Sequence, residues 1–162
     1  MNNDERYIQR DRMRFIKNTQ SSSLCYLAIL FDVFYFVSIY KSDVGTYYYN
    51  ILVGGSIVYN LIFMLAVFLA SEGVKNYKRN YSYLLCAVGI GQIIRIFILP
   101  TQAHNAVTVI NGVDALVMHD GQFTRVVVYL AVSAVCLIAS ALINLMKCKE
   151  LDEHMKTLEA NT

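Results

Sequence analysis

Hydrophobic residues in this chain gather in four long blocks, separated by shorter polar stretches. The blocks cover about residues 24–40, 51–70, 81–99 and 126–146. Each is long enough to cross the hydrocarbon core of a bilayer as a helix, which takes about 17–25 apolar residues. We therefore predict an all-α integral membrane protein, in which residues 21–146 form a bundle of four antiparallel transmembrane helices.

Two charged residues interrupt this apolar pattern at similar depths. Asp32 lies at the middle of the first block and is the only acidic residue in any of the four. Arg95 lies about four residues, or roughly 6 Å, beyond the middle of the third block. A charge at the centre of a transmembrane helix costs about 2.5–3.5 kcal/mol and usually faces the bundle interior with a partner. We therefore predict that Asp32 and Arg95 form a buried ion pair.

Two amide side chains lie close to the same depth. Asn60 is at the middle of the second block, and Gln92 precedes Arg95 by three residues, which places both on one helical face. Amides hydrogen-bond between helices inside a membrane. We expect a buried polar cluster made of Asp32, Asn60, Gln92 and Arg95 at the centre of the bundle.

Small residues form stripes along the blocks at helical spacing. Such residues let two helix backbones approach closely, and serine also hydrogen-bonds across the contact. The candidate helix-packing positions are Gly54, Gly55, Gly89, Gly91, Ser133 and Ser140.

The longest connection between blocks covers about residues 100–125. Apolar residues recur within it at helical spacing, so we predict a short helix on the outer surface; they are Val109, Ile110, Val113, Leu116 and Val117. His104, Asp114, His119 and Asp120 share this connection, but their spacing matches no metal-binding motif, and we expect no metal site.

Positive charge is distributed unevenly between the two sides of the predicted bundle. Of the 14 Lys and Arg residues, eleven lie in the two terminal tails and the connection between the second and third blocks. Only Lys41 and Arg125 lie in the other two connections, and the remaining cation is Arg95. Because basic loops stay in the cytoplasm, we expect both termini to be cytoplasmic.

The two tails are residues 1–20 and 147–162. In the first, Arg6, Arg10, Arg14 and Lys17 gather on one side of a helical wheel, and apolar residues cover much of the rest. This pattern is typical of an amphipathic helix that lies on an anionic inner leaflet. Two alternatives are a solvated topology signal that does not fold and a segment that docks on a soluble cytoplasmic protein.

Several chemistries lack the residues that they need. The four cysteines lie within the blocks or at the cytoplasmic end and form no C-x-x-C pair, which argues against a thiol oxidoreductase. The three histidines lie outside the blocks, where they cannot supply two axial haem ligands. There is no H-E-x-x-H and no phosphate-binding glycine loop. We expect neither an enzyme nor a cofactor, and the basic tail is too short to indicate nucleic-acid binding.

Two hypotheses for function follow. In the first, the chain is a non-catalytic accessory or structural subunit of a larger membrane complex, a transporter, and the Asp32–Arg95 pair holds the helices in place. In the second, it is a small homo-oligomeric ion- or proton-coupled transporter or channel that uses Asp32 and Asn60. An arginine partner favours ionised Asp32, which argues against a proton carrier. We favour the first.

Overall fold

Each hydrophobic block of the sequence forms one long α-helix in the computed structural model, which describes residues 17–40, 51–110 and 113–160. The helices are α2 (Thr19–Ile39), α4 (Ile51–Lys75), α5 (Arg79–Asn105) and α6 (Asp120–Ala160). All four are long and apolar enough to cross a membrane. A helix suits that setting because it satisfies its own backbone N–H and C=O groups.

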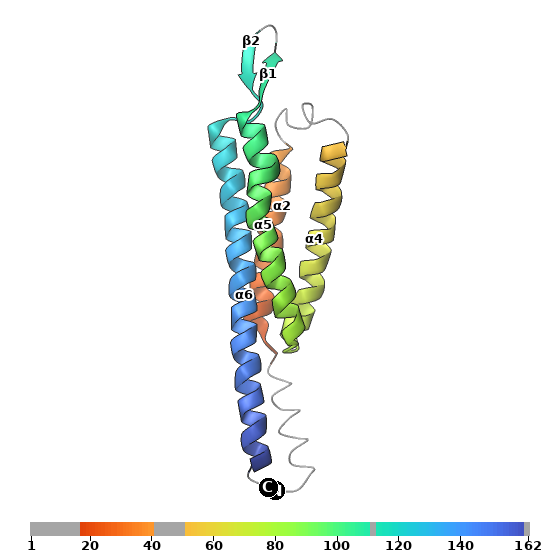
Figure 1. The fold of residues 1–162 in the computed structure, drawn as a ribbon, viewed down its shortest axis with the longest axis vertical. Helices are drawn as coiled ribbons and strands as arrows, with labels where there is room; N and C mark the ends of the chain where they lie inside the picture. Colours follow the sequence, from red (N-terminus) through yellow and green to blue (C-terminus); the bar gives the residue numbers. More distant parts are fainter. Residues whose placement is uncertain (1–16, 41–50, 111–112, 161–162) are drawn as a thin grey trace.

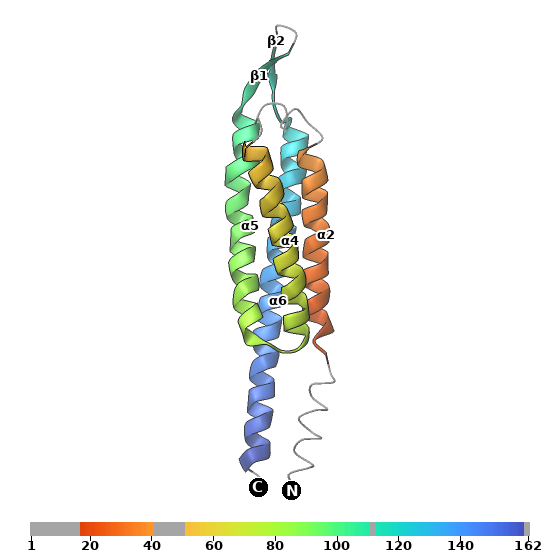
Figure 2. The same cartoon turned by 90° about the vertical axis from the view of Figure 1, so that its right-hand side faces the viewer.

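The four helices run alternately up and down and form a long, narrow bundle (Figure 1). Figure 2 shows α5 and α2 on either side, with α4 in front and α6 behind. The packed neighbours are α2 with α4, α4 with α5, α5 with α6, and α6 with α2. Helices α2 and α5 therefore face each other across the centre of the bundle. Asp32 is on α2 and Arg95 is on α5.

Two helix boundaries have clear local causes. Asn18 caps α2, because its side-chain oxygen accepts a hydrogen bond from the Ser21 backbone N–H. Helix α5 continues through Pro100, which has no N–H to offer the Ile96 carbonyl one turn earlier. The Thr101 hydroxyl donates to that carbonyl at 2.8 Å, and so the helix extends to Asn105.

The bundle is apolar on both sides of a central polar layer. One apolar cluster includes Ala28, Val67, Leu85 and Leu137, drawn from all four helices. The other lies nearer the connection between α5 and α6, and its buried members are Tyr35, Ile39, Leu99, Ala103, Val117, Met118, Val126 and Leu130. No described residue of α4 belongs to this second cluster, and Figure 1 shows α4 diverging from the other helices at that end.

The outside of the bundle is also strongly apolar. Ile62, Phe97 and Val135 are each more than 60% exposed, and many other large apolar side chains are similarly open. A water-soluble bundle would place polar residues on this surface. Apolar side chains outside and hydrogen-bonded polar side chains inside are the arrangement expected of a helix bundle in hydrocarbon.

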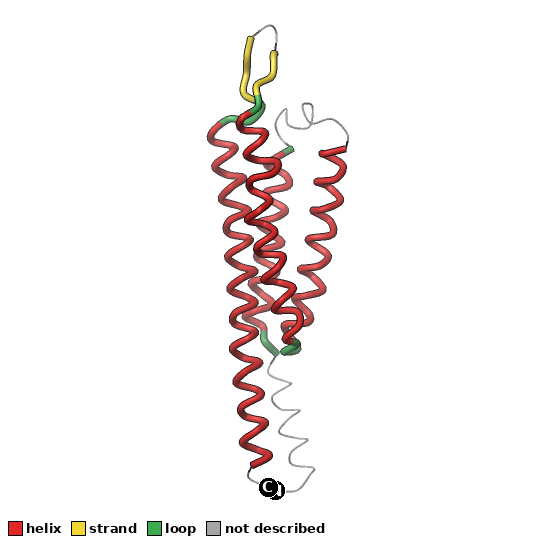
Figure 3. The backbone as a smooth tube through the Cα atoms, in the orientation of Figure 1, coloured by secondary structure: helices red, strands yellow, loops and turns green. Residues whose placement is uncertain are grey.

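The predicted short outer helix is wrong. The segment forms an antiparallel β-hairpin, with β1 (Val107–Ile110) paired to β2 (Val113–Leu116) in the register Val107↔Leu116 and Val109↔Asp114. Figure 3 shows it projecting beyond the helices. The strands are joined by Asn-Gly, the strongest short sequence signal for a hairpin, and β-branched residues favour strands.

The tails differ in how far the structure describes them. Helix α6 continues to Ala160, so most of the predicted tail 147–162 is an extension of the fourth long apolar helix. Residues 1–16 lie outside the described part of the chain, and with them the predicted amphipathic helix and Arg6, Arg10 and Arg14. Lys17 is described and exposed, and it precedes α2.

Candidate functional site

The central polar layer is organised around the Arg95 guanidinium. Its Nη1 donates to Asp32 Oδ1 at 3.0 Å and to Gln92 Oε1 at 3.4 Å, and its Nη2 donates to Asn60 Oδ1 at 2.6 Å. Gln92 Nε2 also donates to Asp32 Oδ1, at 3.0 Å. The structure thus brings together all four residues of the polar cluster expected from the sequence. They come from α2, α4 and α5.

Burial makes these contacts important for the bundle. Asp32, Asn60 and Gln92 are fully buried, and Arg95 is 6% exposed. Charges at this depth are stable only when they are paired and hydrogen-bonded. Gln92 and Arg95 lie three residues apart on one face of α5, which lets both side chains reach the same carboxylate oxygen.

Two tyrosine rings complete the surroundings of Arg95. The guanidinium carbon lies 4.3 Å from the centre of the Tyr35 ring and 5.0 Å from that of Tyr59. Both distances fall within the range of a cation–π attraction. Sequence reasoning missed these residues, although Tyr35 follows Asp32 by one helical turn and Tyr59 is adjacent to Asn60.

The polar layer is not fully satisfied within the described part of the chain. Asp32 Oδ2 and Asn60 Nδ2 are buried, and neither forms a hydrogen bond there. One is an acceptor and the other is a donor. A buried polar atom without a partner is costly, so these two atoms lower the stability that the polar layer gives to the bundle.

A cleft of about 440 Å³ lies beside this layer, between α4 and α5. Its polar lining comes from Ser56 and Tyr59 on α4 and from Arg95 and Gln102 on α5. Gly55 and Gly91 also line it, and their lack of side chains contributes to the open space. The cleft lies on the side where α4 diverges from the bundle.

The expected glycine packing positions differ in what they contact. A Cβ added at Gly89 would lie 3.0 Å from Ile138 Cγ1, so this glycine allows close contact with α6. A Cβ at Gly91 would lie 3.3 Å from the Tyr59 hydroxyl. Gly54 and Gly55 have no described atom within 4 Å of the added Cβ, so they pack against no described helix.

One glycine that sequence reasoning missed makes a closer contact. A Cβ at Gly73 would collide with the Tyr81 ring, which lies against it near the turn between α4 and α5. The sequence indicates this contact only weakly, because Gly73 lies about one turn before the short connection between α4 and α5.

Ser133 and Ser140 belong to a second polar network, which joins α2 to α6. Ser133 Oγ donates to the Ala28 carbonyl at 3.1 Å, and Ser140 Oγ donates to the Ser21 carbonyl at 2.7 Å. Asn144 extends this network, because it accepts from Asn18 Nδ2 at 3.1 Å and donates to Ser82 Oγ at 2.7 Å. The bonds of Ser140 and Asn144 connect α6 to the beginnings of α2 and α5, at the end of the bundle opposite the hairpin.

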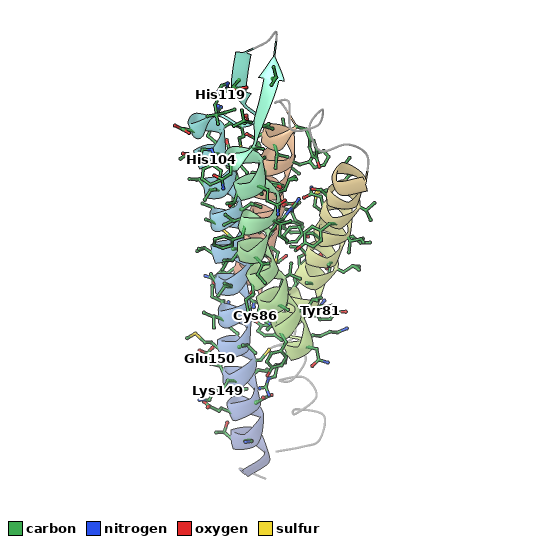
Figure 4. All side chains as sticks on the ribbon, turned by 45° about the horizontal axis from the view of Figure 1, so that its top comes forward. Tyr81, Cys86, His104, His119, Lys149 and Glu150 are labelled. Carbon is green, nitrogen blue, oxygen red and sulfur yellow. The ribbon has the colours of Figure 1, made fainter. Side chains whose placement is uncertain are left out.

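The histidine and aspartate residues of the longest connection do not gather into a metal site. Figure 4 shows His104 and His119 near the hairpin end of the molecule, with Lys149 and Glu150 toward the opposite end. His104 stacks on Phe123 with a ring separation of 4.4 Å, and its Nε2 lies 3.8 Å from Asp120 Oδ1. Among the described residues, no group of three or more potential ligands could hold a metal ion.

Comparisons of the chain with protein families, with curated proteins and with solved structures give no match.

Proposed function

We propose that this protein is a non-catalytic accessory subunit of a larger membrane complex, and that this complex is a transporter. The observation that carries the proposal is the β-hairpin. It projects beyond the bundle and exposes large apolar side chains at a place where a four-helix protein has no need of them.

One face of the hairpin carries three exposed large apolar side chains, Val107, Val109 and Leu116. Val107 and Val109 lie two residues apart on β1 and therefore share a face, and the register places Leu116 and Asp114 opposite them. Val109 is 66% exposed, Val107 is 52% exposed and Leu116 is 43% exposed. A two-stranded hairpin alone is at best marginally stable in water. Contact with another protein would bury this face and stabilise the hairpin.

The polar layer supports a structural role for the bundle itself. Arg95 is bonded to three side chains from three helices, and such a network fixes the relative positions of those helices. An apolar perimeter suits a protein that stays in the bilayer or packs against other transmembrane helices. Neither feature requires catalytic chemistry.

The proposal includes an orientation. Eleven basic residues lie in the tails and the α4–α5 connection, which favours both termini in the cytoplasm. The hairpin then lies on the other side of the membrane, and the partner presents an extramembrane surface there. The basic tails would contact the anionic inner leaflet or a cytoplasmic protein.

The test combines site-specific photo-crosslinking at Val109 with purification of the tagged protein in a mild detergent. We expect a heterologous membrane protein at fixed stoichiometry, crosslinked through the hairpin. Val109→Lys should lose this partner, because it replaces the most exposed of the three apolar side chains on this face with a charged one. Ala115→Lys is the matched control, since strand alternation places position 115 on the other face, and it should keep the partner.

Two results would contradict this function. One is a protein that purifies only with copies of itself and forms no crosslink to another chain from Val109. The other is an equal loss of partner in both hairpin variants, which would indicate a folding defect rather than a lost contact.

A second candidate is a small homo-oligomeric transporter or channel that uses Asp32 and Asn60. The cleft beside Arg95 favours this second candidate, because it is an open space next to the polar layer. Proton and alkali-cation flux into liposomes containing the purified protein would test it. Flux that disappears in Asp32→Asn, with assembly intact, would support this candidate over the first.

A further inference from the structure

The α4–α5 cleft has the size and lining of a small-molecule site. Pockets for small ligands usually enclose about 300–1,000 Å³ and combine an apolar wall with a few placed polar groups. This cleft has a volume of about 440 Å³, and Ile94, Ile98 and Leu99 supply most of its apolar wall on α5. Its polar groups are Arg95, the Gln102 amide, and the hydroxyl groups of Ser56 and Tyr59.

Arg95 keeps donor capacity for a ligand. A guanidinium has five N–H groups and no acceptor. Three of its hydrogen bonds go to Asp32, Gln92 and Asn60, and the same group lines the cleft. The hydroxyls of Ser56 and Tyr59 are further donors on the α4 side. A ligand that accepts hydrogen bonds, such as one with a carbonyl oxygen, would therefore match the polar end of the cleft.

The charge balance of the polar layer indicates which net charge the head group of a ligand should have. Asp32 and Arg95 are the charged residues of the polar layer, and their formal charges cancel. An anionic or cationic head would add an uncompensated charge at a depth where charges are expensive. A neutral head adds none. It would also leave the Asp32–Arg95 bond intact.

The cleft opens toward the exposed apolar surface of the bundle. Ile94 and Ile98 line it and are each more than half exposed. From Gly91 to Gln102 the lining follows α5 for roughly 16 Å at 1.5 Å per residue. A long apolar chain can therefore enter sideways from the bilayer and lie along α5.

From these observations we propose that the α4–α5 cleft binds a neutral bilayer lipid, whose carbonyl-bearing head accepts hydrogen bonds from Arg95 and Tyr59 and whose chain lies along Ile94 and Ile98. This site is independent of the partner that the hairpin would contact. It concerns a different surface of the molecule.

The experiment uses monoolein that carries a photoreactive diazirine in its chain, with the full-length protein in lipid nanodiscs. We expect crosslinks on α5 around Ile94 and Ile98, which unlabelled monoolein competes away. Lysophosphatidic acid with the same oleoyl chain tests the charge, and octadecene, which has no head group, tests the carbonyl. Both should compete at least about tenfold more weakly, which corresponds to about 1.4 kcal/mol.

Adjacent glycines give a matched pair of variants. Gly55→Leu places a side chain in the cleft, whereas Gly54 does not line it, and neither position has a described atom within 4 Å of an added Cβ. Gly55→Leu should reduce saturable labelling at least about tenfold, because the added side chain occupies the lipid's volume. Gly54→Leu should label like the unchanged protein, and both variants should elute as the same folded species on gel filtration.

Three outcomes would overturn the proposal. Labelling that unlabelled monoolein does not reduce, or that spreads equally to exposed positions such as Val135 on α6, would show ordinary lipid contact. Stronger competition by lysophosphatidic acid would make the site anionic. Loss of a protein partner in Gly55→Leu, without any monoolein labelling of the unchanged protein, would assign the cleft to a partner helix.

Discussion

At the scale of single residues, the centre of the bundle depends on how Arg95 is compensated. Its charge is balanced by Asp32, its hydrogen bonds are accepted by three side chains, and its flat faces lie near two tyrosine rings. Each contact is modest by itself, since hydrogen bonds between membrane helices average about 0.6 kcal/mol. The larger effect is the cost of leaving either charge unpaired.

The ion pair should therefore respond asymmetrically to mutation. Asp32→Asn and Arg95→Gln each leave one buried charge alone, and we expect each to destabilise the protein by about 3–5 kcal/mol. The double variant removes both charges, and it should recover much of that stability. Thermal unfolding in detergent measures this, with the exposed Glu72→Gln as a control that should change little. A double variant as unstable as the sum of the two single variants would contradict the pairing.

Helix packing at Gly89 makes a second prediction at this scale. An added Cβ would already lie within 3.0 Å of Ile138 Cγ1, so Gly89→Leu should separate α5 from α6 and cost about 1–3 kcal/mol or more. Gly54→Leu should have little effect on the same unfolding curve, because no described atom is near it. Equal melting temperatures for the two variants would show that the contact at Gly89 relaxes without strain.

At the scale of elements, the chain between the middle of α5 and the start of α6 consists of three consecutive parts. Helix α5 continues past Pro100, the chain forms a hairpin, and α6 begins directly at Asp120. The hairpin is attached to the bundle through Val117, whose N–H donates to the Ala106 carbonyl at 3.1 Å. Because this bond closes the base of the hairpin, the two helices and the hairpin form a continuous unit.

The continuity of α5 through Pro100 depends on Thr101. Thr101→Val keeps the shape of the side chain but removes the donor to the Ile96 carbonyl, which is then unpaired. We expect a loss of about 1–2 kcal/mol. Hydrogen exchange measured by mass spectrometry should show faster exchange in residues 101–105 than in the unchanged protein. Thr101→Ser keeps the hydroxyl and should exchange normally. Normal exchange in Thr101→Val would mean that the proline site needs no side-chain donor.

At the scale of the whole molecule, the distribution of basic residues predicts the orientation in the membrane. After replacement of the four native cysteines, Asp114→Cys places a thiol on the hairpin, and Lys149→Cys places one at the opposite end of α6. A membrane-impermeant maleimide applied to intact cells should label the first and not the second, because the proposed orientation makes the hairpin external and the tail cytoplasmic. Permeabilised cells should label both. The reverse pattern would invert the proposed orientation.

The four apolar helices were predictable from the sequence, and the reason is physical. The free energy of placing a segment in hydrocarbon is nearly a sum over its residues, so a run of apolar letters determines it without knowledge of the fold. Depth also follows from counting residues along a helix, which is why Asp32, Asn60, Gln92 and Arg95 could be placed at one level. The Asn-Gly hairpin signal is equally local, but sequence reasoning missed it, because the apolar spacing of this segment was interpreted as helical.

Lateral arrangement was decided only by the tertiary structure. Which helices are neighbours, where α4 diverges, and which glycines contact another helix depend on side-chain packing between segments far apart in the chain. Gly54, Gly55 and Gly89 look alike in sequence, yet only Gly89 lies against a described helix. For the same reason, the rings beside Arg95 and the cleft between α4 and α5 could not be read from residue spacing. By itself the sequence determined the helices and the depth of their polar residues, whereas their side-by-side packing created the site.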